Sequence, residues 1–143
     1  MYSDLLRRNA LGNIREFVKA ITIDPSMLYY LNGVQNNKFA PNENYSRELL
    51  ELFTIGKGPL VGSGDYTNFT EEDIKQMAAI LTGWRVRLNQ TPGPDEYYFE
   101  VFFQNELHDI NTKQLSHRFD NIQVSNNEED EYRDLIDIIF SSL

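Results

Sequence analysis

The chain has 143 residues, of which 41% are hydrophobic and 13% aromatic, and it contains no cysteine. That length suits one domain with a single hydrophobic core. The lack of cysteine excludes disulfides, thiolate metal sites and cysteine nucleophiles. No apolar run approaches the roughly 18–20 residues that cross a bilayer, so no transmembrane segment is expected.

The formal net charge is −9, and the whole excess lies in the C-terminal third. Residues 1–90 carry ten basic and ten acidic side chains, whereas residues 91–143 carry three basic and twelve acidic ones. No basic stripe with interleaved aromatic residues occurs, although that pattern is typical of nucleic-acid binding. The charge balance therefore disfavours nucleic acid and anionic membranes as partners, and it favours a cationic partner, a metal ion or plain solubility.

Two helices are predicted in the N-terminal part of the chain. The first begins at a capping serine, Ser3, and its apolar residues recur at three- and four-residue spacing up to Ile21. Asp24-Pro25 ends this helix and begins the next, with the aspartate as N-cap and the proline at the first helical position. The second helix is expected to end at Gly33.

Three more helices follow. One runs from near Asn42 to Gly56, one from a capping box at Thr70 to Trp84, and one over residues 128–143. The glycine-rich residues 56–66 form a loop between the first two of these. Because the loop follows a helix and its glycines match neither dinucleotide-binding nor P-loop spacing, we interpret it as a connector rather than a phosphate site.

One segment predicts β structure. Residues 97–103 hold five aromatic residues and a β-branched valine, and residues 86–88 can pair with them across an 89–96 turn. The predicted fold class is mainly α, an irregular helical domain of about five helices with a small β-hairpin. Residues 1–143 are expected to form one domain. Both ends lie in apolar helical patterns, which indicates a segment excised from a longer chain.

The third predicted helix carries the first group of candidate site residues. Glu43, Arg47 and Glu51 follow one another at four-residue steps, so two carboxylates can hold Arg47 on one helix face. On a solvated surface this is an ordinary ladder, but when buried it is a costly network that is more often functional. Glu48 lies beside the apolar face, which favours partial burial. Glu43, Arg47 and Glu48 are therefore candidate catalytic residues.

A structural interpretation of the same helix start is preferred over the catalytic one. The side-chain amides of Asn42 and Asn44 can cap free backbone N–H groups, and a buried Arg47 can join several loop carbonyls. On this interpretation Arg47→Ala should cost a few kcal/mol. The candidate binding residues are Asn42, Asn44, Trp84 and Arg85.

His108-Asp109 forms the second candidate site. A histidine beside a carboxylate can act as a general base with its orienting acid, and imidazole with carboxylate oxygen can ligate a divalent metal. His117 and Asp120 repeat the pair at three-residue spacing, but two histidines nine residues apart without a third ligand are a weak metal pattern. The commoner case is a histidine satisfied in a loop. No cofactor is predicted, and a divalent metal at His108 and Asp109 is the weaker alternative.

Several blocks of the sequence resemble a known bacterial family. They are Asp-Pro-Ser-Met-Leu-Tyr-Tyr-Leu at residues 24–31, Ala-Pro-Asn-Glu-Asn-Tyr-Ser-Arg-Glu-Leu-Leu-Glu-Leu-Phe-Thr-Ile-Gly at 40–56, Tyr-Thr at 66–67, Leu-Thr-Gly-Trp-Arg at 81–85, and His-Asp with Thr-Lys at 108–113. In this order they are similar to the central signature of the family catalogued as domain of unknown function 1800. The resemblance covers roughly residues 5–118.

The resemblance implies a larger, mostly helical bacterial protein that is often exported and is commonly encoded near a second exported, sulfatase-like family. An exported or periplasmic location is therefore expected, with the final helix continuing into further segments. Two departures from the family pattern occur. Asn68-Phe69 stands where Tyr-Thr is usually followed by glutamate, and Ile110-Asn111 stands where glycine usually precedes lysine-threonine.

Two hypotheses of function follow. In the first, the chain is a noncatalytic binding or scaffolding module that binds another protein or a cell-surface polymer. This hypothesis explains the exposed-looking aromatic residues at 97–99, the acidic C-terminal third and the lack of a complete catalytic set. In the second, it is part of a hydrolase-like enzyme, with or without help from a metal, in which the carboxylates and Arg47 of the third helix converge with His108-Asp109 on one pocket. A short distance between Glu48 and His108 in a cleft would favour the enzyme.

Overall fold

The computed structural model describes residues 13–51, 54–94 and 96–142. Within these ranges the chain forms five α-helices, which are α2 (Ile14–Thr22), α3 (Pro25–Tyr30), α4 (Glu43–Glu51), α5 (Glu71–Ile80) and α6 (Glu131–Ser141). Four short 3₁₀ helices connect them, namely η1 (Gly33–Gln35), η2 (Asn105–Leu107), η3 (His117–Phe119) and η4 (Glu128–Asp130). None of the helices in the described ranges is both long and apolar enough to span a bilayer.

The prediction of a mainly α fold is wrong. Helix makes up 45% of the structure and strand 20%, in three antiparallel sheets of two strands each. The pairs are β1 (Leu60–Gly62) with β2 (Asp65–Tyr66), β3 (Trp84–Gln90) with β4 (Tyr97–Phe103), and β5 (Lys113–Gln114) with β6 (Gln123–Val124). Strands of two or three residues are too short to show the alternation that marks a strand in sequence, so only the longer hairpin could be predicted.

The helix boundaries follow local capping chemistry. The Asp24 carboxylate accepts from the backbone N–H groups of Ser26 and Met27, and Thr70 forms a capping box with Asp73, as the sequence predicts. Asn13 caps α2, while the predicted start of that helix at residues 3–12 lies outside the described residues. The last helix starts at Glu131 rather than 128, because residues 128–130 form η4.

The third predicted helix corresponds to α4, and its predicted stop is at Gly56. Helix α4 is described to Glu51, and residues 52–53 lie outside the described ranges. Gly56 has a φ of +73°, and its N–H donates to the Leu50 carbonyl at 2.8 Å. Glycine adopts this conformation readily, so Gly56 turns the chain away at the point where the sequence predicts a stop.

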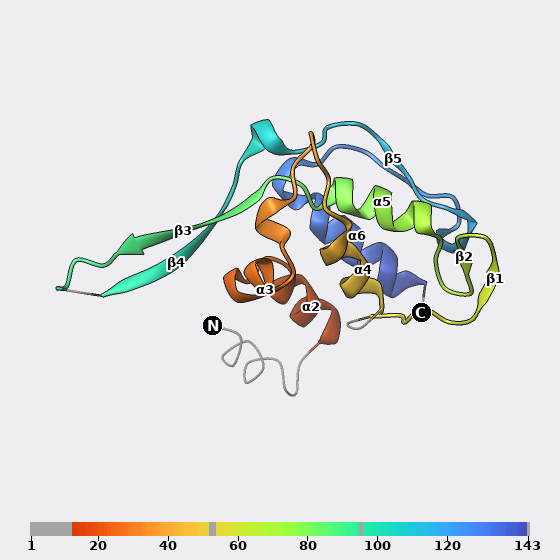
Figure 1. The fold of residues 1–143 in the computed structure, drawn as a ribbon, viewed down its shortest axis with the longest axis horizontal. Helices are drawn as coiled ribbons and strands as arrows, with labels where there is room; N and C mark the ends of the chain where they lie inside the picture. Colours follow the sequence, from red (N-terminus) through yellow and green to blue (C-terminus); the bar gives the residue numbers. More distant parts are fainter. Residues whose placement is uncertain (1–12, 52–53, 95, 143) are drawn as a thin grey trace.

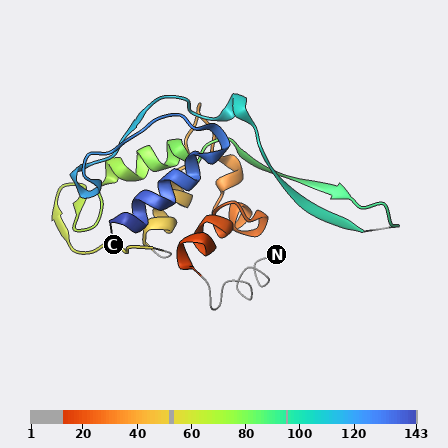
Figure 2. The ribbon, with the colours of Figure 1, turned by 180° about the vertical axis from the view of Figure 1, so that it is seen from behind.

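The helices enclose the core of a compact body. Helix α4 packs against α5, α6 packs against both α2 and α5, and the paired β5 and β6 run along the outer side of α5 (Figures 1 and 2). The fully buried side chains include Leu49, Leu50, Phe69, Ile74, Met77, Ile80, Leu135, Ile136 and Ile139. Burial of this largely aliphatic set between three helices is the main stabilising contribution.

Strands β3 and β4, with the turn between them, form an arm (residues 84–103) that projects from the body in both ribbon views (Figures 1 and 2). At its base the buried Trp84 ring packs edge-on against Phe103 and Tyr132. The Arg85 guanidinium donates to the Asn36 and Trp84 carbonyls at 3.1 and 2.7 Å. The arm is therefore anchored at its base.

Candidate functional site

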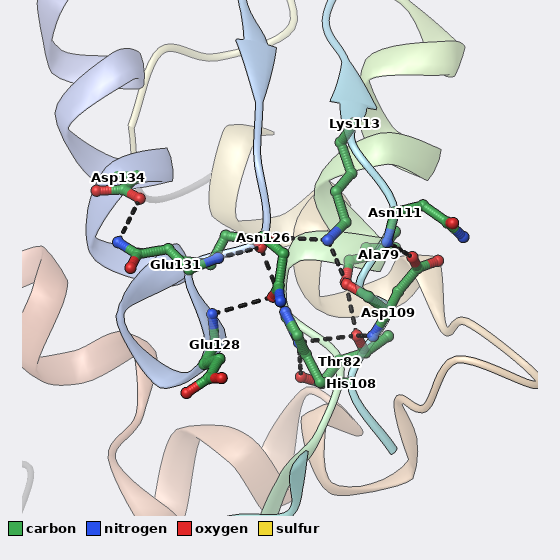
Figure 3. Close-up of polar contacts among 12 residues, drawn as sticks. Ala79, Thr82, His108, Asp109, Asn111, Lys113, Asn126, Glu128, Glu131 and Asp134 are labelled. Atoms are coloured by element: carbon green, nitrogen blue, oxygen red, sulfur yellow. Dashed lines mark hydrogen bonds and ion pairs between the residues drawn. The ribbon is translucent and has the colours of Figure 1, made fainter. Parts of the chain in front are cut away.

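His108 lies at the centre of a buried polar network that joins the end of α5, residues 108–113 and the start of α6 (Figure 3). Its Nδ1 lies 2.8 Å from the Thr82 carbonyl oxygen. Because a carbonyl oxygen only accepts, Nδ1 carries a proton and donates it. The Thr82 hydroxyl donates to the Ala79 carbonyl at 2.6 Å and accepts from the Asp109 backbone N–H at 2.8 Å. The end of α5 and the 108–109 segment are thus joined through one threonine.

Glu131, at the start of α6, occupies the other side of the His108 ring. Its Oε1 lies 3.3 Å from Nε2 of His108 and accepts the Asn127 N–H at 3.0 Å. Its Oε2 lies 2.7 Å from Nζ of Lys113, which also donates to the Asp109 carbonyl. Both ring nitrogens of His108 and both carboxylate oxygens of Glu131 therefore lie within hydrogen-bond distance of a partner.

The network requires a close approach of three segments at Gly83. This residue has a φ of +99°, and a Cβ placed on it would lie 3.0 Å from the Phe103 ring, 3.1 Å from the Gln104 carbonyl and 3.2 Å from the His108 Cβ. The Gln104 N–H donates to the Gly83 carbonyl at 2.8 Å. The Thr-Gly-Trp block therefore has a structural explanation, since threonine binds the histidine, glycine allows the approach and tryptophan anchors the arm.

A second ionic cluster lies on α4 and α5. The Arg47 guanidinium makes a two-point contact with Glu71, at 3.0 Å to Oε1 and 2.8 Å to Oε2, and the Tyr66 hydroxyl donates to Oε1 at 3.0 Å. The predicted partners Glu43 and Glu51 lie farther away, at 3.7 and 3.9 Å. Arg47 is half-buried, so its principal partner comes from another helix and not from its own.

The Arg47–Glu71 contact raises the pKa of Arg47 and lowers the pKa of Glu71. The hydrogen bonds from Arg47, and then the one from Tyr66, hold the pKa of Glu71 below its usual value despite partial burial. The bond to Glu71 likewise raises the pKa of Arg47. The pair is therefore ionised at neutral pH.

The asparagines at the start of α4 stabilise the turn before that helix. The Asn42 side chain accepts the Asn44 N–H at 2.9 Å, and the Asn44 amide donates to the Leu31 carbonyl at 3.0 Å. The buried Asn36, which the sequence analysis missed, accepts the Asn42 N–H at 2.8 Å and donates to the Ala78 carbonyl at 2.7 Å. These contacts link α3, α4 and α5 through short side chains.

The structure does not bring the two groups of candidate catalytic residues together. His108 contacts Thr82, Glu131 and the Phe103 ring, and within the described ranges it has no partner from α4, where Glu43, Arg47 and Glu48 lie. Asp109 contributes its backbone N–H and carbonyl to the network, and its carboxylate accepts the Asn111 N–H at 2.8 Å. Among the described residues, the predicted convergence of the two groups on one pocket therefore has no contact to support it.

The sequence analysis identified His108 and Asp109 but missed Thr82, Lys113 and Glu131. Lys113 and Glu131 are 18 residues apart, and His108 and Glu131 are 23 apart, so no local spacing rule connects them. The available signals were the sequence blocks at residues 81–85, which contains Thr82, and 108–113, which contains Lys113; neither block contains Glu131. His117 and Asp120 are exposed, and no group of three or more potential metal ligands occurs in the part of the chain that the structure describes.

Comparisons with known proteins identify the sequence family of this chain and no individual relative. Neither the curated proteins nor the solved structures contain a match to this chain. The sequence model of the family described as "Protein of unknown function (DUF1800)" matches residues 1–142. This range includes the Asn-rich start of α4, the Thr-Gly-Trp block and the His108 network. The chain therefore belongs to the DUF1800 family.

Proposed function

We propose that this chain is a noncatalytic binding module that contacts a protein partner through the β3–β4 arm. The observation that carries the proposal is the exposure of large apolar side chains on one face of an element that projects from the body: Leu88, Tyr97 and Phe99. Exposed apolar patches of this kind mark interaction sites. Tyrosine and phenylalanine are also enriched at the centres of protein interfaces.

The hydrolase-like alternative has weaker geometric support. A general base must reach the proton that it removes, directly or through one water. The His108 ring and the Glu131 carboxylate are fully buried and already engaged with Thr82, Lys113 and each other. This arrangement suits a structural link between segments. We further propose that the module acts as part of an exported protein, as the family resemblance suggests.

Site-specific photo-cross-linking tests the binding function. A photoreactive phenylalanine derivative replaces Tyr97 on one face of the arm, and the matched control carries it at Tyr98 on the other face. In the bacterium that encodes the chain, we expect a covalent adduct with a protein partner from position 97 and a much weaker one from position 98. Equal labelling from both positions, or no adduct from either, would overturn the proposal.

A further inference from the structure

The arm has one face without formal charge. Strands β3 and β4 pair in register, so Leu88 lies opposite Phe99, and residues two positions apart share a face. We define the apolar face of the arm as Val86, Leu88, Gln90, Tyr97, Phe99 and Val101. Its exposure increases away from the body, because Val86 and Val101 pack partly against the core whereas Leu88 is 58%, Phe99 45% and Tyr97 58% exposed.

The charged side chains of the two strands lie on the opposite face. There Arg87 Nε lies 2.8 Å from Glu100 Oε2, and Asn89 also donates to this carboxylate. Arg85 and Tyr98 share that face in the same register. A partner of the apolar face therefore meets no charge that needs compensation.

The apolar face continues onto the body. The Tyr29 ring on α3 packs edge-on against Phe99, with the ring centroids 5.9 Å apart, and it is itself 52% exposed. An aromatic side chain can bury about 150–250 Å², so the exposed parts of this surface amount to roughly 500 Å² per copy. Two copies would bury roughly 1,000 Å², which is the lower limit for a specific interface.

We propose that the apolar face of the arm binds a second copy of this chain, giving a two-fold symmetric dimer. In such an interface the same patch of each copy contacts its equivalent in the other copy. Because the apolar face carries no formal charge, no like charges are brought together. The arm residues 84–103 carry two basic and three acidic side chains, so eight of the nine excess negative charges lie elsewhere in the chain. The arm projects from the body (Figure 1), so a contact between two arms would increase the distance between the two acidic bodies.

A second copy would also cover the face of the arm that the body leaves exposed. A two-stranded hairpin is marginally stable in water unless one of its faces is covered. The body of the same chain covers the base of the arm, around Trp84 and Phe103, and beyond it Tyr29 reaches Phe99, which is still 45% exposed. The inference rests on the proposed function, because it identifies the partner of the same contact element.

Analytical ultracentrifugation of the purified chain tests the dimer. Given the small area, we expect a monomer–dimer equilibrium with a Kd on the order of 1–100 μM. The association should strengthen as NaCl rises from about 20 to about 500 mM, because salt screens the repulsion between two acidic bodies. A monomer at all concentrations up to about ten times that range would overturn the proposal, as would dimerisation that weakens with salt.

Paired variants on the two faces locate the interface. Phe99→Thr should weaken dimerisation at least about tenfold, whereas Tyr98→Thr, on the same strand with 48% exposure, should change it less than about twofold. Leu88→Lys places like charges in the interface and leaves the Tyr29–Phe99 contact in place, so it should also dissociate the dimer. Fluorescence of Trp84, the only tryptophan, reports whether the base of the arm stays folded.

The outcomes separate this inference from the proposed function. Dimerisation that is equally sensitive to Tyr98→Thr and Phe99→Thr, or insensitive to both, would refute the apolar face as the interface. A monomeric chain that still forms an adduct with another protein from position 97 would retain the binding function and reject the second copy as its partner. A monomer without any adduct would reject both proposals.

Discussion

The two ionic clusters of this chain have similar chemistry at different depths. In the His108 network, the Lys113 and Glu131 side chains are 1% and 0% exposed, whereas in the α4–α5 cluster the Arg47 and Glu71 side chains are 33% and 34% exposed. A buried charge that loses its partner stays desolvated, whereas a half-exposed one recovers water. We therefore expect the depth of each cluster, more than its number of charges, to set how strongly it stabilises the fold.

The largest expected effect comes from Lys113→Met. The substitution removes the ammonium group and leaves the Glu131 carboxylate buried without its charge partner, so we expect a loss of about 3–5 kcal/mol in the free energy of unfolding. Urea unfolding followed by Trp84 fluorescence measures it. The exposed Lys75→Met is the matched control, and a comparable loss there would remove the contrast between the two clusters.

A double variant sharpens this prediction. Adding Glu131→Gln to Lys113→Met removes the unpaired charge while keeping an oxygen for the Asn127 N–H, so part of the lost stability should return. Strictly additive effects of the two substitutions would show that Lys113 and Glu131 do not interact in solution.

The next largest effect is expected at Gly83, where the network meets the arm. Gly83→Ala introduces a Cβ at positive φ within 3.0–3.2 Å of neighbouring atoms, and we expect a cost of about 1–3 kcal/mol. Gly56→Ala is the matched control, since Gly56 also has a positive φ but a Cβ added to it would meet no atom within 4 Å. Equal losses from both variants in thermal unfolding would assign the effect to backbone conformation alone.

Arg47→Met should have a smaller effect than either. Because Arg47 and Glu71 are both about one-third exposed, water replaces much of the lost interaction, and we expect a loss of about 1 kcal/mol. This value is lower than the few kcal/mol expected from the sequence on the assumption of full burial. A loss as large as that of Lys113→Met in the same urea experiment would contradict the distinction based on depth.

The smallest expected effect is a pH dependence of that same pair. In the folded state the pKa of Glu71 lies below its ordinary value of 4.5, chiefly because of Arg47. The pair therefore contributes stability above about pH 4.5, and this contribution is lost as the pH falls through the lower folded-state pKa. The stability difference between the wild-type chain and Arg47→Met should shrink on acidification. A difference that stays constant down to about pH 3 would contradict this linkage.

Local sequence rules predicted the elements better than the sites. The caps at Asp24 and Thr70 and the β3–β4 hairpin are all present, because each depends on residues a few positions apart. The main partners in both clusters were missed. Glu71 lies 24 residues from Arg47, and Glu131 lies 23 residues from His108. Helical i,i+4 spacing identified Glu43 and Glu51, which turned out to be the more distant carboxylates.

The family, the helix starts capped by Asp24 and Thr70, the long hairpin and the uneven distribution of charge can be read from the sequence, because these features reside in contiguous residues. Which charges are buried, and that Thr82, Lys113 and Glu131 surround His108, depends on the tertiary structure. The physical reason is that burial and ion pairing depend on which distant segments pack together, and close approaches such as the one at Gly83 exist only after the chain has folded.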